Sequence, residues 1–196
     1  MGKKKNRETP DEILVVSAIM GDLVAFDELV LRYRGAVVRI ARSITGPDDA
    51  EDIAQDAFLI AFKALPSIEM PSKFAAWLNA ITRNRARRFL REEKNHRQRR
   101  VGLDEVLLQQ IAALSLPFGD ERETEELILA LDKIPQDYAL ALRMHFFDEM
   151  PHKRIAAFLG VPVSTVKWRV HRGKKYLREQ FEHLRIKEEL WKKKKN

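Results

Sequence analysis

Residues 152–175 read HKRIAAFLGVPVSTVKWRVHRGKK, which is the pattern of two short helices joined by a tight turn. The first helix is predicted over 152–159, and Gly160 can adopt the left-handed conformation that ends a helix. Residues 161–163 form the turn, and the Ser164 hydroxyl is placed to cap the second helix. The residues predicted to face the core are Ile155, Ala156, Leu159, Val166 and Val170. The stretch therefore predicts a helix-turn-helix.

The second helix of this motif places polar and basic side chains on its outward face. Their spacing is the one needed to meet base edges in the major groove of DNA, and the lysines at 174 and 175 lie where a helix end contacts phosphates. The alternative is a basic surface hairpin. DNA binding is favoured because a turn glycine, a cap and a basic helix coincide in one basic chain. The candidate DNA-contacting residues are Ser164, Thr165, Lys167, Trp168, His171, Arg172, Lys174 and Lys175.

Composition limits the class of protein. The chain has 196 residues, 45% of them hydrophobic, and a net charge of +7, which favours a polyanionic partner, either nucleic acid or an anionic membrane surface. It contains no cysteine, so disulfides and thiolate metal sites are excluded. No apolar run approaches the roughly 20 residues of a membrane span, and no signal-peptide pattern follows Met1. We expect a soluble, cytoplasmic protein.

Charge is unevenly distributed along the chain. Nine basic and two acidic residues lie between 83 and 100, whereas seven acidic residues and one basic residue lie between 104 and 126. A basic block followed by an acidic one indicates a boundary between units with different partners.

The remaining periodicity is helical, and the fold class expected is all-α: two small helical domains joined by a flexible linker, the second containing the helix-turn-helix. Apolar residues recur at steps of three and four over 26–44 and 50–65, with a break at 46–48. Ser72 is expected to cap a further helix, in which Phe74, Trp77 and Ile81 are spaced as a core stripe. Two more helices are predicted, one marked by Leu127, Leu131 and Ile134 and the other by Tyr138, Leu142 and Phe146. The expected divisions are a basic N-terminal extension (1–10), a first domain (11–96), a linker (97–121), a second domain (122–182) and a basic C-terminal tail (183–196), for which disorder is the default.

Four blocks of sequence resemble one known family. They are GDLVAFDELVLRYRGAVVRIA (21–41), DDAEDIAQDAFLIAFKAL (48–65), KFAAWLNAITRNRARRFLR (73–91) and GVPVSTVKWRVHRGKKYLRE (160–179). They resemble the extracytoplasmic-function (ECF) group of bacterial RNA polymerase sigma factors, in the family's order, over about 18–100 and 122–182. The segment DAEDIAQDAF is the most specific, because a lone helix-turn-helix is weaker evidence.

This resemblance implies three interfaces. The first is a ridge that binds the core polymerase, and its residues are Asp52, Gln55, Asp56 and Leu59. The alternative is that the carboxylates only stabilise the N-terminus of their helix. The second captures an unstacked base of the −10 element and holds the separated strand; its residues are Phe74, Asn84, Arg83, Arg87, Arg88 and Arg91. The third is the helix-turn-helix at the −35 element. The linker would thread through the core enzyme.

Two positions depart from the family's pattern. Arg154 stands where a glutamate is usual, which adds positive charge beside the DNA and puts the contact made by that glutamate in doubt. Trp168 stands where a small polar residue is common, so the −35 preference is expected to be unusual. The Lys-rich end also extends beyond the usual end of the family; its alternatives are a basic arm on DNA, a membrane-surface anchor and, by default, a disordered tail.

The leading hypothesis is a sigma factor that directs promoter-specific initiation, with no catalytic residues, metal site, cofactor or small-molecule substrate. Its implied partners are core RNA polymerase, promoter DNA and an anti-sigma factor, the last being its only link to a membrane. The main alternative is a stand-alone helix-turn-helix regulator that binds operators as a dimer. A nuclease is disfavoured because the five histidines are scattered and the carboxylates cluster on one helix.

Overall fold

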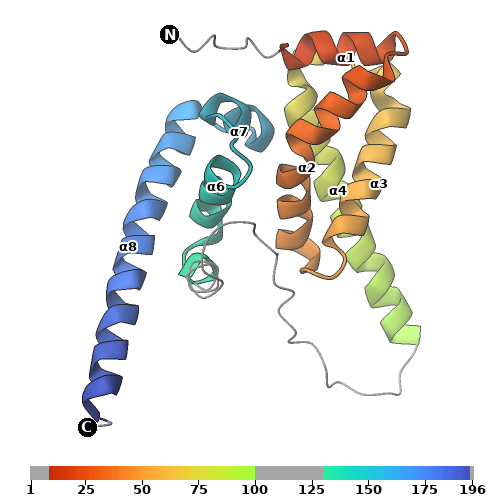
Figure 1. Cartoon of the computed structure of the whole chain (residues 1–196). Coiled ribbons are helices and arrows are strands. Elements are labelled where there is room, and N and C mark those ends of the chain that lie inside the picture. Colours follow the sequence, from red (N-terminus) through yellow and green to blue (C-terminus); the bar gives the residue numbers. More distant parts are fainter. Residues whose placement is uncertain (1–8, 100–129, 195–196) are drawn as a thin grey trace, which may run out of the picture. The chain divides into compact units, whose positions relative to one another are not determined.

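The computed structural model describes residues 9–99 and 130–194, and every regular element within those ranges is helical (Figure 1). The described residues form two compact units: residues 9–99 and 157–160 make the first, and residues 130–156 and 161–194 make the second. This confirms the predicted all-α fold with two helical domains. Residues 100–121 of the predicted linker lie outside the described residues.

The first unit is a four-helix arrangement. Its elements are α1 (Asp11–Ile19), α2 (Leu23–Thr45), α3 (Ala50–Ala64), the 3₁₀ turns η1 (Leu65–Ser67) and η2 (Pro71–Lys73), and α4 (Phe74–Arg99). The Asp22 carboxylate begins α2 by accepting hydrogen bonds from the amides of Val24 and Ala25 at 3.0 and 3.2 Å. Gly46, with φ 94°, ends it at the predicted break.

The core of this unit lies where α2 contacts α1, α3 and α4, and where α3 contacts α4. Buried alanines allow the backbones of these helices to approach closely; Ala41, Ala50 and Ala86 form one cluster with Ile53. The largest fully buried side chains are Leu29, Tyr33, Ile40, Ile53, Leu65, Phe74 and Leu78. The helices predicted at 26–44 and 50–65 are α2 and α3. Ser72 was expected as a cap, but it lies within η2, so that expectation is wrong.

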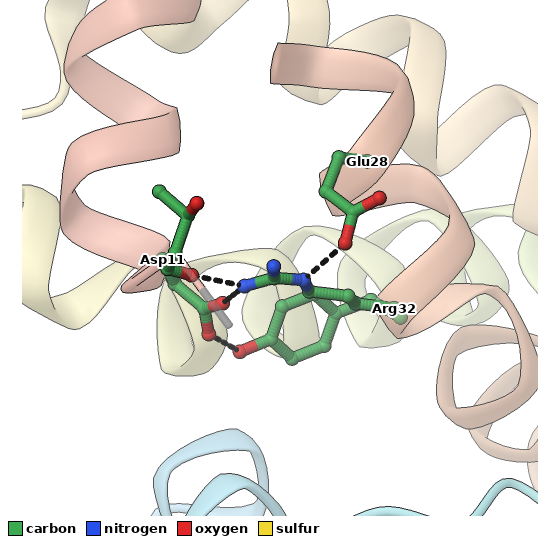
Figure 2. Close-up of polar contacts among 5 residues, drawn as sticks. Asp11, Glu28 and Arg32 are labelled. Atoms are coloured by element: carbon green, nitrogen blue, oxygen red, sulfur yellow. Dashed lines mark hydrogen bonds and ion pairs between the residues drawn. The ribbon is translucent and has the colours of Figure 1, made fainter. Parts of the chain in front are cut away.

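Arg32 ties α1 to α2, as Figure 2 shows. Its Nη1 donates to Asp11 at 2.7 Å and to the Thr9 carbonyl at 2.6 Å, and its Nε donates to Glu28 at 2.8 Å. The Tyr33 hydroxyl donates to the other Asp11 oxygen at 2.5 Å. Burial alone would lower the pKa of Arg32, but the bonds to Asp11 and Glu28 outweigh it and raise the pKa. The first helix is therefore held by a charge-assisted network.

The second unit contains α6 (Gln136–Phe146), the first residues of α7 (His152–Leu159) and α8 (Val163–Lys194). Gly173 lets α6 and α8 approach closely, because a Cβ there would lie 2.8 Å from Leu142 Cδ1 and 3.3 Å from Tyr138 Cβ. Of the helix expected around Leu127 to Ile134, only the end is described, and both Leu131 and Ile134 are buried there.

The helix-turn-helix has the predicted α7, ending at Gly160 with φ 68°. The cap of the second helix differs from the prediction. Because the Pro162 carbonyl accepts from the amides of Thr165 (3.0 Å) and Val166 (3.3 Å), Pro162 occupies the N-cap position. Ser164 lies in the first turn of α8 and not at its cap.

The C-terminal tail is also different from the default expectation of disorder. The backbone of α8 continues as one helix through residue 194, so most of residues 183–196 are helical. Over the part of the chain that the structure describes, no helix is both long and apolar enough to cross a membrane.

Candidate nucleic-acid interface

The outward face of α8 carries the predicted DNA-contacting residues. Val166 and Val170 are buried, as predicted, and this fixes the opposite side of the helix as its outer face. Trp168 is 54% exposed at the centre of that face, and Thr165 is half-buried at its margin. The other predicted residues, all exposed, are Ser164, Lys167, His171, Arg172, Lys174 and Lys175. The structure thus gathers all eight on or beside one cationic surface.

Aromatic side chains from α6 and α8 contact several of these residues. The Trp168 ring meets Tyr138, the Arg172 guanidinium lies over Tyr176, and Lys174 Nζ lies 4.7 Å from the centroid of Phe146. Sequence reasoning placed Tyr138 and Phe146 only in a helix stripe and did not single out Tyr176. The sequence signal that could have identified them is the presence of aromatic residues both before and after the basic second helix of the motif.

A pair of imidazoles stacks beside this surface. The rings of His145 and His152 are 4.3 Å apart between centroids, and His145 Nδ1 lies 3.1 Å from the Met150 carbonyl oxygen. His152 Nε2 is buried without a hydrogen-bond partner among the described atoms. Burial lowers the pKa of His152, and the positive charges of His145, Lys167 and Lys174 lower it further. The neutral form of His152 is therefore favoured in the fold.

In the first unit, the predicted polymerase-binding ridge lies along α3. Asp52 and Gln55 are exposed, and Leu59 is 57% exposed beside them. Asp56 is half-buried because Arg85 of α4 holds its carboxylate at 2.7 Å. The ridge is thus present, but one of its two carboxylates is engaged within the molecule.

Two grooves, each of about 610 Å³, flank this ridge. The groove between α2 and α3 is mainly apolar, with Phe26, Phe58 and Phe62 in its lining; its charged lining residues are Asp27, Arg34 and Glu51. The groove between α3 and α4 combines apolar and basic side chains; it is lined by Asp56, Leu59, Ile60, Lys63, Ile81, Asn84, Arg85, Arg88 and Arg91.

The predicted −10 residues are only partly brought together. Asn84, Arg88 and Arg91 line the α3–α4 groove, and Arg87 is exposed on the same helix. Arg83 is half-buried and donates to Asn79 at 3.1 Å, and it does not line the groove. Arg88 also pairs with Glu92 at 2.8 Å, an exposed pair that phosphate can displace at little cost.

Phe74 does not fit the expectation that it captures a base. Its ring is 1% exposed and lies against Tyr33 and Trp77, with centroid distances of 5.8 and 6.0 Å. A ring inside the core offers no face for stacking. The apolar walls beside Asn84 are instead Leu59, Ile60 and Ile81. Sequence reasoning missed Ile60 and Lys63 and read Ile81 as core, because a groove arises from how two helices pack.

Among residues 9–99 and 130–194, no cluster of three or more histidine or carboxylate side chains has the arrangement of a metal site.

Comparison with known proteins identifies the family. The family model described as Sigma-70 region 2 matches residues 29–96, and that described as Sigma-70, region 4 matches residues 124–177. The chain is 31% identical to the ECF RNA polymerase sigma factor SigW of Bacillus subtilis (strain 168), over 84% of this chain and 92% of the relative. It is 26% identical to the ECF RNA polymerase sigma-E factor of Escherichia coli (strain K12), over 91% of this chain and 98% of the relative.

Two solved structures are similar as well. CnrH, solved in complex with the cytosolic domain of CnrY, has a TM-score of 0.55 at 26% identity, covering 88% of this chain and 97% of that chain. The sigma factor RpoE from Bartonella quintana, solved with the anti-sigma factor NepR, has a TM-score of 0.50 at 26% identity, covering 80% and 96%. Fold, matched regions and relatives agree, and the chain belongs to the ECF group of sigma-70-family RNA polymerase sigma factors.

Proposed function

We propose that this chain binds core RNA polymerase through its first unit and directs it to promoters that α8 reads at −35 and the α3–α4 groove reads at −10. The observation that carries this division is the α3 ridge of Asp52, Gln55 and Leu59, which has an apolar groove on one side and an arginine-lined groove on the other. One helix thus separates a surface suited to protein from a surface suited to nucleic acid.

The α2–α3 groove is the proposed seat of a polymerase helix. Phe26, Phe58 and Phe62 supply apolar area, and Phe62 is 43% exposed while its ring meets Phe26 edge-on at 5.0 Å. Asp27 and Glu51 also line this groove, and Glu51 pairs with Arg34 at 3.4 Å. Burying exposed rings stabilises a complex, and the Asp27 carboxylate favours a basic partner.

The α3–α4 groove is the proposed −10 site. Leu59, Ile60 and Ile81 can pack against the faces of an unstacked base, and the Asn84 amide can both donate to and accept from its edge. Arg88 and Arg91 lie where they can neutralise the phosphates of the separated strand. In this proposal Ile60 and Ile81 take over the part that the sequence assigned to Phe74.

The helix α8 is the proposed −35 reader. Its outward face carries five cationic or imidazole side chains around Trp168, which suits a helix lying in the major groove with its ends against phosphate.

An anti-sigma factor is the proposed regulator. RpoE from Bartonella quintana was solved with such a factor, and the exposed apolar residues of the α2–α3 groove are a surface that an inhibitor can cover. Any link to the membrane would be through that partner, and the proposed site of action is the cytoplasm. Sigma factors are transcription initiation factors, and we propose that this one has no catalytic activity of its own.

A gel-shift comparison tests this proposal against a stand-alone regulator. Genomic fragments are incubated with the chain alone, with core polymerase alone and with both. We expect specific complexes only when both are present. Tight specific binding by the chain alone, with half-sites arranged as a dimer requires, would favour the regulator and contradict the proposal.

A further inference from the structure

Trp168 has an unusual environment for a residue on a DNA-reading helix. It shares one ridge of α8 with Ser164, His171 and Lys175, opposite the buried Val170. Trp168 is 54% exposed, although burying a large aromatic ring contributes more to stability than burying a smaller side chain. Its neighbours on the ridge are polar or cationic, so the indole is the main apolar surface there.

One side of that indole is held by α6. The Tyr138 and Trp168 rings have centroids 5.4 Å apart and planes at 73°, which is the edge-to-face geometry preferred by aromatic pairs. The residue before Tyr138 is anchored as well, because Asp137 accepts from Arg169 Nη2 at 2.6 Å. The support for the indole therefore comes from a second helix that is itself fixed to α8.

The same support reaches Arg172. Tyr138 stacks on Tyr176 with centroids 5.6 Å apart and planes at 21°. The Arg172 guanidinium lies over the Tyr176 ring, 5.5 Å from its centroid. A continuous line of contacts thus runs from Trp168 through Tyr138 and Tyr176 to Arg172. A guanidinium stacked by its face keeps its N–H edge available for hydrogen bonds.

The chemistry of the two held side chains determines what each can read. An indole has one N–H donor and otherwise apolar surface, and the apolar feature of an unmodified major groove is the methyl group of thymine. An arginine edge matches the two acceptors of guanine. Residues four apart on a helix are separated by about 6 Å along its axis, which is close to the rise of two base pairs.

We propose that Trp168 is a specificity-determining residue that contacts a thymine methyl in the −35 element, and that Tyr138 and Tyr176 are positioning residues for Trp168 and Arg172. This inference rests on the proposed placement of α8 in the −35 major groove. It accounts for a large aromatic side chain that is exposed at the centre of the DNA-reading face and held in place by Tyr138.

Replacing thymine by uracil tests the inference, because it removes the methyl group and leaves base pairing intact. Promoter fragments selected by the reconstituted holoenzyme are made with uracil at one −35 position at a time, on either strand. Complex formation is measured at limiting holoenzyme. We expect one position at which the wild-type holoenzyme loses about fourfold, the effect of one buried methyl group. Trp168→Ser holoenzyme should bind thymine and uracil fragments equally.

The positioning role has its own readout. Tyr138→Ala should move the thymine-to-uracil ratio toward one, and Tyr138→Phe should keep the wild-type ratio because the ring and not the hydroxyl makes the contact. A general loss of stability weakens binding to both fragments and leaves their ratio unchanged.

The inference is overturned if no uracil position matters to the wild type, if the selected −35 element has no thymine on either strand, or if Trp168→Ser keeps the discrimination. An unchanged ratio in Tyr138→Ala overturns the positioning role. Failure of the proposed function looks different, because the wild-type holoenzyme would then select no promoter fragment at all.

Discussion

Arg85 of α4 and Asp56 of α3 form a two-point contact: Nε donates to the carboxylate oxygen at 2.8 Å and Nη2 lies 2.7 Å from the same oxygen. The arginine-rich helix α4 is therefore joined to a helix that carries three carboxylates, at Glu51, Asp52 and Asp56. Arg85 also lies 5.9 Å from the centroid of Phe89, so its side chain is fixed by charge and by packing. Arg85 thus links α3 to α4 across the groove, in which the proposed phosphate contacts are Arg88 and Arg91.

Asp56→Asn should reduce the stability of the first unit by about 1 kcal/mol, since a partly exposed charge-assisted contact is lost. Asp52→Asn makes the same charge change at an exposed position and should alter stability by less than about 0.5 kcal/mol. Urea denaturation measures both. Because Asp52 faces the proposed partner, its variant should still weaken binding to core polymerase. Equal stability losses in the two variants would contradict this assignment.

Arg91→Ala should reduce the salt dependence of promoter binding. Losing one phosphate contact lowers the slope of log affinity against log salt by about one. Lys133→Ala removes an exposed lysine outside the proposed interfaces and should leave the slope unchanged. The slope is obtained from holoenzyme titrations at several salt concentrations. Parallel lines for wild type and Arg91→Ala would show that this arginine does not neutralise a phosphate.

Gly173→Ala should destabilise the second unit, although alanine is the better helix former. The added Cβ would lie 2.8 Å from Leu142 Cδ1, and overpacking of this kind costs about 1–3 kcal/mol, against a gain of about 1 kcal/mol in helix propensity. Leu142→Ala in the same chain should make room, so the two losses should be less than additive. Thermal melting of the four chains in this cycle checks the coupling, and simple additivity would count against a Leu142 clash.

Low pH should destabilise the second unit through His152. Its pKa is lowered in the fold, so the unfolded chain binds the proton more readily. The stabilising contribution is present above the unfolded value of about 6.5 and is lost as the pH falls through the folded pKa. Between about pH 8 and pH 5.5, the melting temperature should fall more for wild type than for His152→Gln. His171→Gln, at an exposed position, should behave like wild type; identical pH profiles for wild type and His152→Gln would refute the prediction.

The sequence predicted those parts of the fold that depend on local periodicity. The stripe along 26–44, the stop at Gly46 and both ends of α7 are encoded within a few residues, so they could be read directly. Ser164 shows the limit of this reasoning. It is a good capping residue two positions after Pro162, whose carbonyl begins α8, and the sequence alone does not show which of these two residues is the N-cap.

The candidate sites were less predictable for a different reason. Periodicity indicates that Phe74 and Ile81 share a helix face, but it does not say that Phe74 meets Tyr33 in the core while Ile81 lines a groove. That distinction depends on where α3 crosses α4. The line of rings from Trp168 to Tyr176 likewise joins two helices that are remote in sequence, and no local pattern contains it.

The central claim is that this chain gives core polymerase its choice of promoter, and mapping of transcript 5′ ends tests it most directly. Genomic DNA is transcribed in vitro by core polymerase with and without the purified chain. The account predicts new start sites that share two upstream elements, with transcripts lost when Asn84 and Trp168 are replaced together. A set of start sites identical with and without the chain would contradict it.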